Sequence, residues 1–409
     1  MKIGVLKERR PGELRVAASP ETVRKFVGLG FDVTIETGAG VGAAITDDAF
    51  AAAGATIAAD AAATLADADV VLKVQRPEPE ELALIKRGAK LAAILSPYGD
   101  ADRVKSYADA GVDAFAMEFI PRITRAQSMD VLSSQANLAG YRAVLDAAYE
   151  FGRAFPMMMT AAGTVPPARA FIMGVGVAGL QAIATARRLG AIVSATDVRP
   201  ATKEQVQSLG ATFVAVEDEE FQQAQTAGGY AKEMSADYRA KQAALVAETI
   251  KKQDIVITTA LIPGRKAPVL VTDAMLRTMK TGAVVVDLAV EQGGNVEGSE
   301  PGKIVEKYGV KIVGHTNVPS RIAVDSSALY AKNLLNFLTP LVDKETKALK
   351  IDWNDDIIKG TALTRDGAVV HPTFAPAAAP PPPPQPVAAT PEPAPTPAAE
   401  PAAAPEKAE

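Results

Sequence analysis

The sequence feature that most constrains the fold is a glycine pattern near the middle of the chain. An apolar run at 171–173 breaks into the motif Gly174–Gly179 (GVGVAG), and helical periodicity then continues to about residue 190. This G-x-G-x-x-G spacing between a strand and a helix is typical of a turn that wraps a pyrophosphate. Gly174 permits the tight turn, Gly176 lets backbone N–H groups approach the phosphates, and Gly179 lets the helix pack closely on the strand.

A second apolar run, at 191–196, ends on Asp197. A carboxylate at this point accepts hydrogen bonds from the free diol of an adenosine ribose and repels a 2′-phosphate. Arg199 instead favours NADP(H), because a guanidinium can bind a 2′-phosphate. Asp197 occupies the position that usually decides this selectivity, so we expect NAD(H) rather than NADP(H). A lone glycine motif would be no more than a turn, but the flanking strand, helix, second strand and acid complete a dinucleotide unit.

Composition excludes several classes of function. The net charge of −5 argues against nucleic-acid binding, because the chain has no excess of positive charge to attract phosphates. The chain has no cysteine, which excludes disulfides and thiolate chemistry, and its two histidines, His315 and His371, offer little for a metal site, so we expect no metal. We interpret His315 as a structural residue, because a lone histidine near a strand end is more often hydrogen-bonded than catalytic.

The ends of the chain suggest a soluble, cytoplasmic protein without direct membrane insertion. The N-terminus begins with a strand-like run and lacks the apolar core of a signal peptide, and no segment reaches the roughly 18 apolar residues that span a bilayer. From 375 to 409 the composition collapses to 13 alanines and 13 prolines in 35 residues. Because such a segment cannot bury a core, we expect 373–409 to be a disordered tail.

Apolar runs that alternate with amphipathic stretches predict an α/β fold with two Rossmann-like, doubly wound parallel-sheet domains separated by a cleft. We expect strands at 3–6, 33–36, 70–74, 91–95 and 114–117 in the first domain, and at 171–173, 191–196, 212–214, 254–257 and 283–287 in the second. Long helices are expected at 130–154 and 321–338. Because the second of these leads back, the first domain is expected to comprise 1–129 and 321–372, and the second 130–320.

Several long stretches resemble one protein family. The opening segments 4–8 (GVLKE) and 15–20 (RVAASP) resemble the signature shared by alanine dehydrogenases and nicotinamide nucleotide transhydrogenases. Three further stretches, 122–130 (RITRAQSMD), 157–167 (MMMTAAGTVPP) and 228–234 (GGYAKEM), are similar to the soluble NAD(H)-binding component of proton-translocating transhydrogenases. The likeness covers residues 1 to about 372 and keeps the family's order.

This resemblance implies hydride transfer between NAD(H) held here and NADP(H) held by a separate subunit, coupled to proton movement through a membrane-spanning subunit. It further implies a homodimer that is peripheral on the inner membrane through its partners. Hydride transfer needs aligned rings and a polar frame rather than a covalent residue. The family pattern assigns the nicotinamide end to Arg122, Gln127, Asp130 and Ser133.

The other expected contacts combine the glycine motif with the family pattern. Tyr230 lies in a polar segment whose counterpart in the family is a mobile loop that covers the nucleotide. Ala260 and Leu261 follow an apolar strand, at the sheet edge where ligands of this fold lie. The candidate cofactor-binding residues are Arg122, Ile123, Thr124, Arg125, Gln127, Gly174, Gly176, Val177, Gly179, Asp197, Val198, Arg199, Gly229, Tyr230, Ala260 and Leu261.

Two rival functions share features of this pattern. An alanine dehydrogenase has the same fold and opening motif but also needs a cation for the substrate carboxylate and an acid/base. Arg15 and Lys73 supply charge, yet the stretch 91–95 (LAAIL) has no histidine where that family places its catalytic one. A non-catalytic NAD sensor would keep Gly174–Gly179 and Asp197 and lack an ordered nicotinamide frame.

Overall fold

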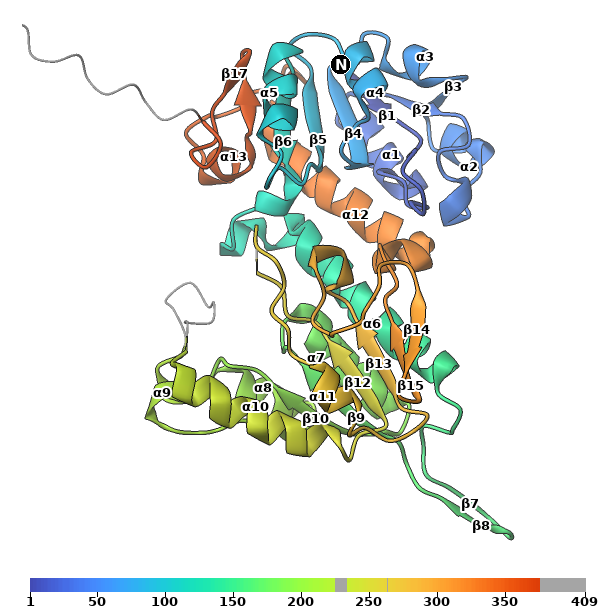
Figure 1. Cartoon of the computed structure of the whole chain (residues 1–409). Helices are drawn as coiled ribbons and strands as arrows, with labels where there is room; N and C mark the ends of the chain where they lie inside the picture. The colour runs from blue at the N-terminus through green and yellow to red at the C-terminus, as the bar shows by residue number, and fades with distance from the viewer. Residues whose placement is uncertain (225–233, 263, 376–409) are drawn as a thin grey trace, which may run out of the picture. The chain divides into compact units, whose positions relative to one another are not determined.

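The structure, a computed structural model, describes residues 1–224, 234–262 and 264–375. These residues form two large, mainly parallel sheets, each with helices on both faces (Figure 1). In these ranges no helix is both long and apolar enough to cross a membrane.

The first sheet has six strands in the order β3-β2-β1-β4-β5-β6, and every neighbouring pair is parallel. This order is that of a dinucleotide-binding fold, with a change of direction between β1 and β4. Its strands are β1 (Lys2–Val5), β2 (Asp32–Glu36), β3 (Thr56–Ala58), β4 (Val70–Gln75), β5 (Lys90–Ile94) and β6 (Asp113–Ala116). Its helices are α1 (Pro20–Gly28), η1 (Val41–Ala43), α2 (Asp47–Ala52), α3 (Ala61–Leu65), α4 (Pro79–Leu84), α5 (Ala101–Asp109), η2 (Met117–Phe119) and η3 (Thr124–Met129).

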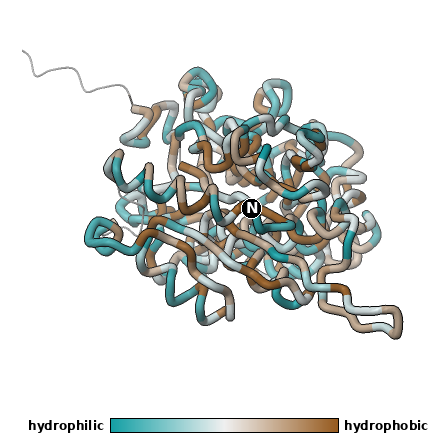
Figure 2. The backbone as a smooth tube through the Cα atoms, turned by 60° about the horizontal axis from the view of Figure 1, so that its bottom comes forward, coloured by the Kyte–Doolittle hydropathy of each residue, from teal (hydrophilic) through white to brown (hydrophobic). Residues whose placement is uncertain are grey.

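Both faces of this sheet are buried, which explains why its strands are mainly apolar. On β4, Val70 and Leu72 enter one core with α1 and α2, whereas Val71 enters the opposite core with α3, α4 and α5. Figure 2 shows apolar residues running through the interior and hydrophilic residues in many of the outer turns. The alternation of adjacent side chains between two cores follows directly from the two-residue period of a strand.

The second sheet repeats the same topology with one added edge strand. Its order is β11-β10-β9-β12-β13-β15-β14, in which only the β14–β15 pair is antiparallel. The strands are β9 (Arg169–Met173), β10 (Ile192–Thr196), β11 (Thr212–Phe213), β12 (Ile255–Thr258), β13 (Val284–Asp287), β14 (Ile304–Lys307) and β15 (Val310–Val313). The helices are α7 (Val177–Arg188), α8 (Thr202–Ser208), α9 (Glu219–Gln222), α10 (Ala236–Ile250), α11 (Asp273–Leu276) and η4 (Val290–Gln292).

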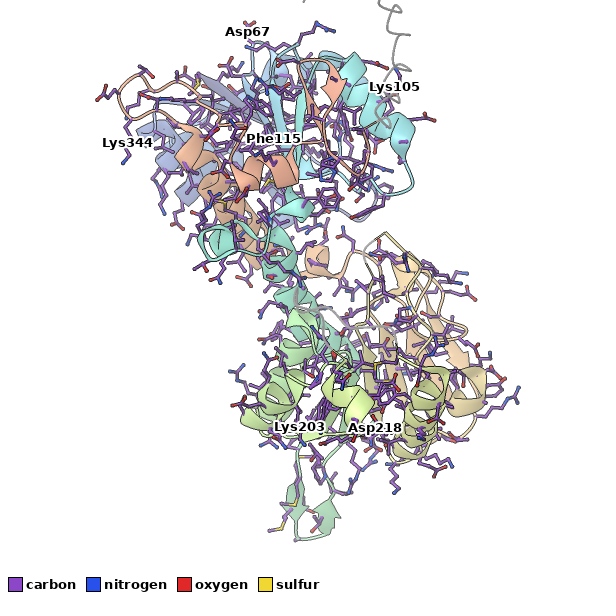
Figure 3. The ribbon with its side chains drawn as sticks, turned by 90° about the vertical axis from the view of Figure 1, so that its left-hand side faces the viewer. Asp67, Lys105, Phe115, Lys203, Asp218 and Lys344 are labelled. Atoms are coloured by element: carbon purple, nitrogen blue, oxygen red, sulfur yellow. The ribbon has the colours of Figure 1, made fainter. Side chains whose placement is uncertain are left out.

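The remaining elements connect or complete these sheets. They are α6 (Val131–Glu150), the hairpin β7 (Met158–Thr160) and β8 (Gly163–Val165), η5 (Val318–Ile322), α12 (Ala323–Leu338), η6 (Thr339–Leu341), α13 (Asp356–Thr361), β16 (Thr364–Arg365) and β17 (Ala368–Val369). Side chains of α12 and α13 join the core of the first sheet. The ring of Phe115, labelled in Figure 3, stacks on that of Trp353 with centroids 5.9 Å apart, so the C-terminal segment packs on β6.

The expected fold class, α/β with two parallel-sheet domains, is confirmed. The exact division into 1–129 with 321–372 and 130–320, and the cleft between the domains, stay predictions. The helix expected at 130–154 ends at Glu150, because Phe151 adopts an extended backbone, and the helix expected from residue 321 begins at Ala323 after a short 3-10 turn. The short strands β3, β14, β16 and β17 and the hairpin β7–β8 were not predicted.

The C-terminal limit of the packed chain also differs from the expectation. Phe374, which we assigned to the tail, stacks on Phe119 at 6.0 Å and lies edge-on to Tyr98 at 5.7 Å. An aromatic side chain can make these contacts despite the apolar-poor composition that follows it. Residues 376–409 lie outside the described residues.

Candidate nucleotide-binding site

The glycine motif forms the turn from β9 into α7, and two of its glycines are required by the backbone itself. Gly174 has φ +97°, which is left-handed, and a Cβ there would lie 2.6 Å from the hydroxyl of Thr259. A Cβ on Gly179 would lie 1.9 Å from the carbonyl oxygen of Gly174. The predicted roles of these two positions, a tight turn and a close helix approach, are the ones that the geometry requires.

Gly176 differs from both, because a Cβ there would meet no heavy atom within 4 Å. It has φ −80° and ψ −165° and precedes the first residue of α7, Val177, which is 39% exposed. No side chain caps this helix end, so the N–H groups of its first turn are available to a ligand. The open space beside Gly176 and the positive end of α7 together suit a bound pyrophosphate.

Asp197 follows β10 at the same sheet edge, and its carboxylate is bonded to the glycine loop. The backbone N–H of Val175 donates to Oδ2 at 2.7 Å. Arg199 donates to the same carboxylate from its backbone N–H and Nε, both to Oδ1 at 2.9 Å, and from Nη2 to Oδ2 at 2.8 Å. The carboxylate raises the pKa of Arg199 through this hydrogen bond. Val198, between the two, is half-buried.

The segment after β12 borders the loop from the other side. The hydroxyl of Thr259 donates to the carbonyl oxygen of Gly174 at 3.0 Å. The amide side chain of Asn295 holds both the N–H of Ala260, at 3.0 Å, and its carbonyl oxygen, at 2.9 Å. Leu261 is 48% exposed at this edge, so Ala260 and Leu261 stand beside the glycine loop as expected from their place after the strand.

Two residues behind this segment were missed from the sequence. Asp287 at the end of β13 is fully buried, and its carboxylate accepts from the N–H groups of Ala289, Asn295 and Val296 at 2.9, 3.0 and 3.2 Å. Asn295 is fully buried as well. Asp287 could have been found from the sequence, because it is an acid at the carboxyl end of an apolar strand. No sequence pattern indicates its partner Asn295, eight residues later in the chain.

The candidate nicotinamide frame lies on η3 and the start of α6. Arg122, Thr124 and Gln127 are exposed, whereas Ala126 and Met129 are buried. Asp130 caps α6 by accepting from the N–H of Ser133 at 2.9 Å and from its hydroxyl at 2.6 Å. Asp130 is therefore engaged with the helix that follows it.

Two other members of the frame have different surroundings. The guanidinium of Arg125 binds Asp355 of the α13 N-cap through two bonds of 2.7 and 2.8 Å, so this side chain is held at the start of α13. Ile123 is half-buried and packs against the core of the first sheet. The carbonyl oxygen of Ser128 accepts from the amides of Asn333 and Asn336, which fixes η3 on α12.

Helix α6 brings the frame and the glycine motif together. A Cβ on Gly140 of α6 would lie 2.0 Å from the carbonyl oxygen of Ala178, so α6 rests on the first turn of α7. Ser133 lies seven residues earlier on α6, about 10 Å along the helix axis. The frame and the glycine motif are separate in the sequence, and the contact between α6 and α7 brings them into one region of the structure.

A buried charge network lies beside the start of α6. The Arg15 guanidinium binds the Glu13 carboxylate at 2.8 and 2.7 Å and the side-chain oxygen of Gln135 at 2.8 Å. Burial alone would raise the pKa of Glu13, but the hydrogen bonds and charge of Arg15, with the amides of Gln75 and Asn317, lower it to about 2. Arg15 is thus neutralised within the protein.

Lys73 is buried in the same way, with its ammonium 3.4 Å from Glu8 and 3.2 Å from Glu81. Burial raises the pKa of Glu8 to about 7, although Lys73 acts in the opposite direction. Both cations that a small carboxylate substrate would use are therefore paired with carboxylates of the chain.

Gly229 and Tyr230 lie outside the described residues, so the proposed covering loop stays a prediction. Among the residues that the structure describes, no group of three or more His, Asp or Glu side chains is placed to hold a metal ion. Burial lowers the pKa of His315, and the positive charge of Arg321 acts in the same direction. His315 borders a cavity of about 510 Å³ formed by α6 residues together with Ile304 and Arg321.

Comparisons with known proteins cover nearly the whole chain. The family models "Alanine dehydrogenase/PNT, N-terminal domain" and "Alanine dehydrogenase/PNT, C-terminal domain" match residues 4–139 and 143–372. The chain is 64% identical to the first portion of the split NAD(P) transhydrogenase alpha subunit of Rhodospirillum rubrum, over 91% of its own length and 99% of that protein. A crystal structure of transhydrogenase from Sinorhizobium meliloti has 59% identity and a TM-score of 0.83, covering 90% of this chain and all of that one. Alanine dehydrogenase of Halomonas elongata is 32% identical over 92% of this chain and 96% of its own.

Proposed function

The chain belongs to the alanine dehydrogenase/PNT family, and we propose that within it the chain is the NAD(H)-binding component of a proton-translocating NAD(P) transhydrogenase. It would hold NAD(H) while hydride passes to or from NADP(H) bound on a separate subunit. The observation that carries NAD(H) binding is the glycine loop, in which two glycines are required by the backbone and the third leaves open space at an uncapped helix end. The transhydrogenase role is supported by the likeness to the transhydrogenase subunit.

The residues present fit a dinucleotide of the NAD type. The N–H groups around Gly176 and Val177 suit the pyrophosphate, and Asp197 suits the 2′- and 3′-hydroxyls of the adenosine ribose. Ala260 and Leu261 border the same loop and suit contact with the middle of the cofactor. When bound, the nicotinamide ring supplies the hydride chemistry, so the protein needs only to orient it and exclude water.

We assign that orienting role to the frame on η3 and α6. The amide of Gln127 offers both a donor and an acceptor to a ribose hydroxyl or carboxamide, and Arg122 offers further donors. Asp130 and Ser133 hold each other, which fixes the first turn of α6. None of these side chains is required to exchange a proton with the substrate, because hydride transfer between two nicotinamides moves no proton at the carbon atoms.

The partners follow from the same proposal. An NADP(H)-binding subunit must approach the nicotinamide end so that the two rings align, and a membrane-spanning subunit must supply the proton path. The chain itself would then be cytoplasmic and attached to the inner membrane through these subunits. This arrangement predicts that the isolated chain binds NADH but translocates no protons.

We also propose that the chain forms a homodimer. The hairpin β7–β8 and the residue before it expose Met157, Met158 and Met159, whose exposed fractions are 60, 43 and 76%. Consecutive exposed apolar residues are typical of a surface that another chain covers. Light scattering should give the mass of two chains, and Met159→Glu should shift the protein toward one. A monomeric wild-type protein would contradict the dimer.

The function is tested by mixing the purified chain with NADH, the NADP-binding subunit and an oxidised NADP analogue whose reduced form absorbs at its own wavelength. Stopped-flow absorbance should show rapid reduction of the analogue only when both proteins are present. Heat-treated chain and chain without NADH are the controls. Absence of transfer in the complete mixture, with NADH binding intact, would refute the transhydrogenase role.

The alanine dehydrogenase alternative is supported by the relatives of that name and is tested in the same preparation. Arg15 and Lys73 would have to bind a substrate carboxylate, yet Glu13 occupies the first and Glu8 and Glu81 the second. Formation of NADH from NAD and L-alanine by the chain alone would establish that activity. NADH binding without either reaction would leave a sensor as the function.

A further inference from the structure

Helix α12 carries one buried amide that contacts both parts of the nicotinamide frame. The helix packs on η3 and on α6 (Figure 1). Asn333 of α12 is only 6% exposed. Its Nδ2 donates to the carbonyl oxygen of Ser128 in η3 at 2.9 Å, and its Oδ1 accepts from the hydroxyl of Ser134 in α6 at 2.7 Å. One side chain therefore joins the segment that carries Gln127 to the helix that begins after Asp130.

The direction of these bonds is set by the buried charge network beside α6. A guanidinium only donates hydrogen bonds, so the 2.8 Å bond from Arg15 must end on the side-chain oxygen of Gln135. The amide nitrogen of Gln135 then donates to the Ser134 oxygen at 3.2 Å, and the shortest bond that the Ser134 hydroxyl itself donates is to Asn333. Asn333 consequently turns its NH₂ group toward the carbonyl oxygen of Ser128, which only accepts. Each amide thus has one orientation that satisfies both of its partners.

We infer that Asn333 is a positioning residue for hydride transfer: it holds η3 on α6 and so fixes where Gln127 presents its amide to the nicotinamide. This inference rests on the proposed function, because it requires the nicotinamide to lie at the frame. Asn333 is almost fully buried, so it acts on the cofactor through Gln127, whose side chain is exposed.

Loss of this bridge should affect the transfer rate and the NADH affinity differently. The pyrophosphate and the adenosine ribose are assigned to the glycine loop and Asp197 of the second sheet, whereas Asn333 acts on η3. A misplacement of about 1 Å at a reacting centre can slow a reaction by roughly 100-fold. We expect Asn333→Asp to lower the rate at saturating NADH by roughly 10- to 100-fold and to change the NADH dissociation constant by less than about threefold.

Asn333→Asp is chosen because it keeps the size of the side chain and an acceptor for Ser134 but loses the donor to Ser128. A carboxylate oxygen then faces the Ser128 carbonyl oxygen, and the two repel each other. Lys332→Gln is the matched control, since this neighbouring side chain on α12 is exposed and pairs with Glu21 at 3.2 Å. It should leave the rate and the affinity unchanged.

A second comparison separates the bridge from a single bond to η3. Asn336 of α12 donates to the same carbonyl oxygen of Ser128 at 3.0 Å. Asn336→Asp removes that bond and keeps the bridge from Ser128 through Asn333 to Ser134. It should therefore slow transfer less than Asn333→Asp does.

The rates come from stopped-flow absorbance of the chain mixed with NADH, the NADP-binding subunit and the oxidised NADP analogue, and the affinities come from isothermal titration with NADH. Gln127→Asn and the double variant with Asn333→Asp complete a cycle. If Asn333 acts through Gln127, the double variant should be about as slow as the slower single variant. Hydrogen exchange at the backbone amides of 124–130, followed by mass spectrometry without nucleotide, should be faster in Asn333→Asp than in the wild type.

The outcomes distinguish this inference from the proposed function. If the wild type transfers hydride and a folded Asn333→Asp does so equally fast, Asn333 has no positioning role. Equal losses of rate and affinity, rate losses that multiply in the double variant, or equal rate losses in Asn333→Asp and Asn336→Asp would also refute it. If the wild type transfers no hydride in the complete mixture, the proposed function fails and this inference fails with it. Should Asn333→Asp not fold, Ser134→Ala cuts the bridge from α6 and must show the same loss of rate with affinity kept.

Discussion

A methyl group at Gly176 is expected to separate nucleotide binding from folding. The φ and ψ of Gly176 are −80° and −165°, which alanine adopts freely, and its Cβ would meet no heavy atom within 4 Å. Substitutions at a surface position without strain usually change stability by less than about 0.5 kcal/mol. We therefore expect Gly176→Ala to unfold in urea at a midpoint close to that of the wild type.

The same methyl group should weaken NADH binding strongly. It stands where we expect the pyrophosphate to approach the N–H groups of the first turn of α7, so at least one charged hydrogen bond is lengthened or lost. Such a bond is worth about 1.5–3 kcal/mol, which corresponds to a roughly 10- to 150-fold increase in the dissociation constant. Isothermal titration with NADH measures this change directly, and circular dichroism during urea unfolding measures the stability.

Gly179→Ala is the matched variant within the same motif. Its Cβ would lie 1.9 Å from the Gly174 carbonyl oxygen, and this clash forces α7 away from β9. Overpacking of this kind costs about 1–3 kcal/mol or more of unfolding free energy. The two variants should thus differ in their main defect. Gly176→Ala should keep its stability and bind NADH weakly, whereas Gly179→Ala should be destabilised. Wild-type affinity for NADH in Gly176→Ala would refute the assignment of the pyrophosphate to this loop.

Three further predictions concern the surroundings of the site. Glu13→Gln should lower the unfolding free energy at pH 7 by roughly 3 kcal/mol. The depressed pKa of Glu13 means that its carboxylate stabilises the fold fully above about pH 4.5, and that this stabilisation is lost as the pH falls toward about 2. The unfolding free energy from urea titrations should therefore change less with pH across this window in the variant, and an unchanged pH dependence would contradict the pairing with Arg15. Gly140→Ala should destabilise the chain by about 1–3 kcal/mol and weaken NADH binding because α6 and α7 must separate, whereas Gly152→Ala, with no atom within 4 Å, should do neither. Gln127→Asn should slow hydride transfer while NADH affinity is largely kept, and equal losses of rate and affinity would show that Gln127 does not position the ring.

Much of the fold was predictable because it depends on local properties. Strands such as β4 and β13 each begin with three consecutive apolar residues, since both of their faces are buried, and such runs stand out in a sequence. Two of the missed strands, β3 and β14, are short and partly exposed at sheet edges, so they lack that signal. The described end of α6 shows the usual uncertainty at a helix terminus, where one extended residue, Phe151, decides the boundary.

The residues of the candidate site likewise differ in whether they depend on local properties of the chain or on long-range contacts. Gly174, Gly179 and Asp197 were identified from spacing alone, because a positive φ, a close approach and an acid after a strand are consequences of the chain within about twenty-five residues. Asn295 could not be identified, since its two bonds to Ala260 join segments thirty-five residues apart whose register depends on the whole sheet.

The sequence by itself therefore determined the family, through the motifs in their order, and the turn of the glycine loop, through backbone sterics. It predicts an NAD-type dinucleotide from that loop and the charge of one acid. Only the tertiary structure decided how these groups are held. In the fold, α6 packs on the first turn of α7 at Gly140, Arg199 binds Asp197, and Arg15 binds Glu13. Backbone conformation is set by near neighbours along the chain, whereas the partner of a charged side chain is set by which elements the fold brings within hydrogen-bonding distance of it.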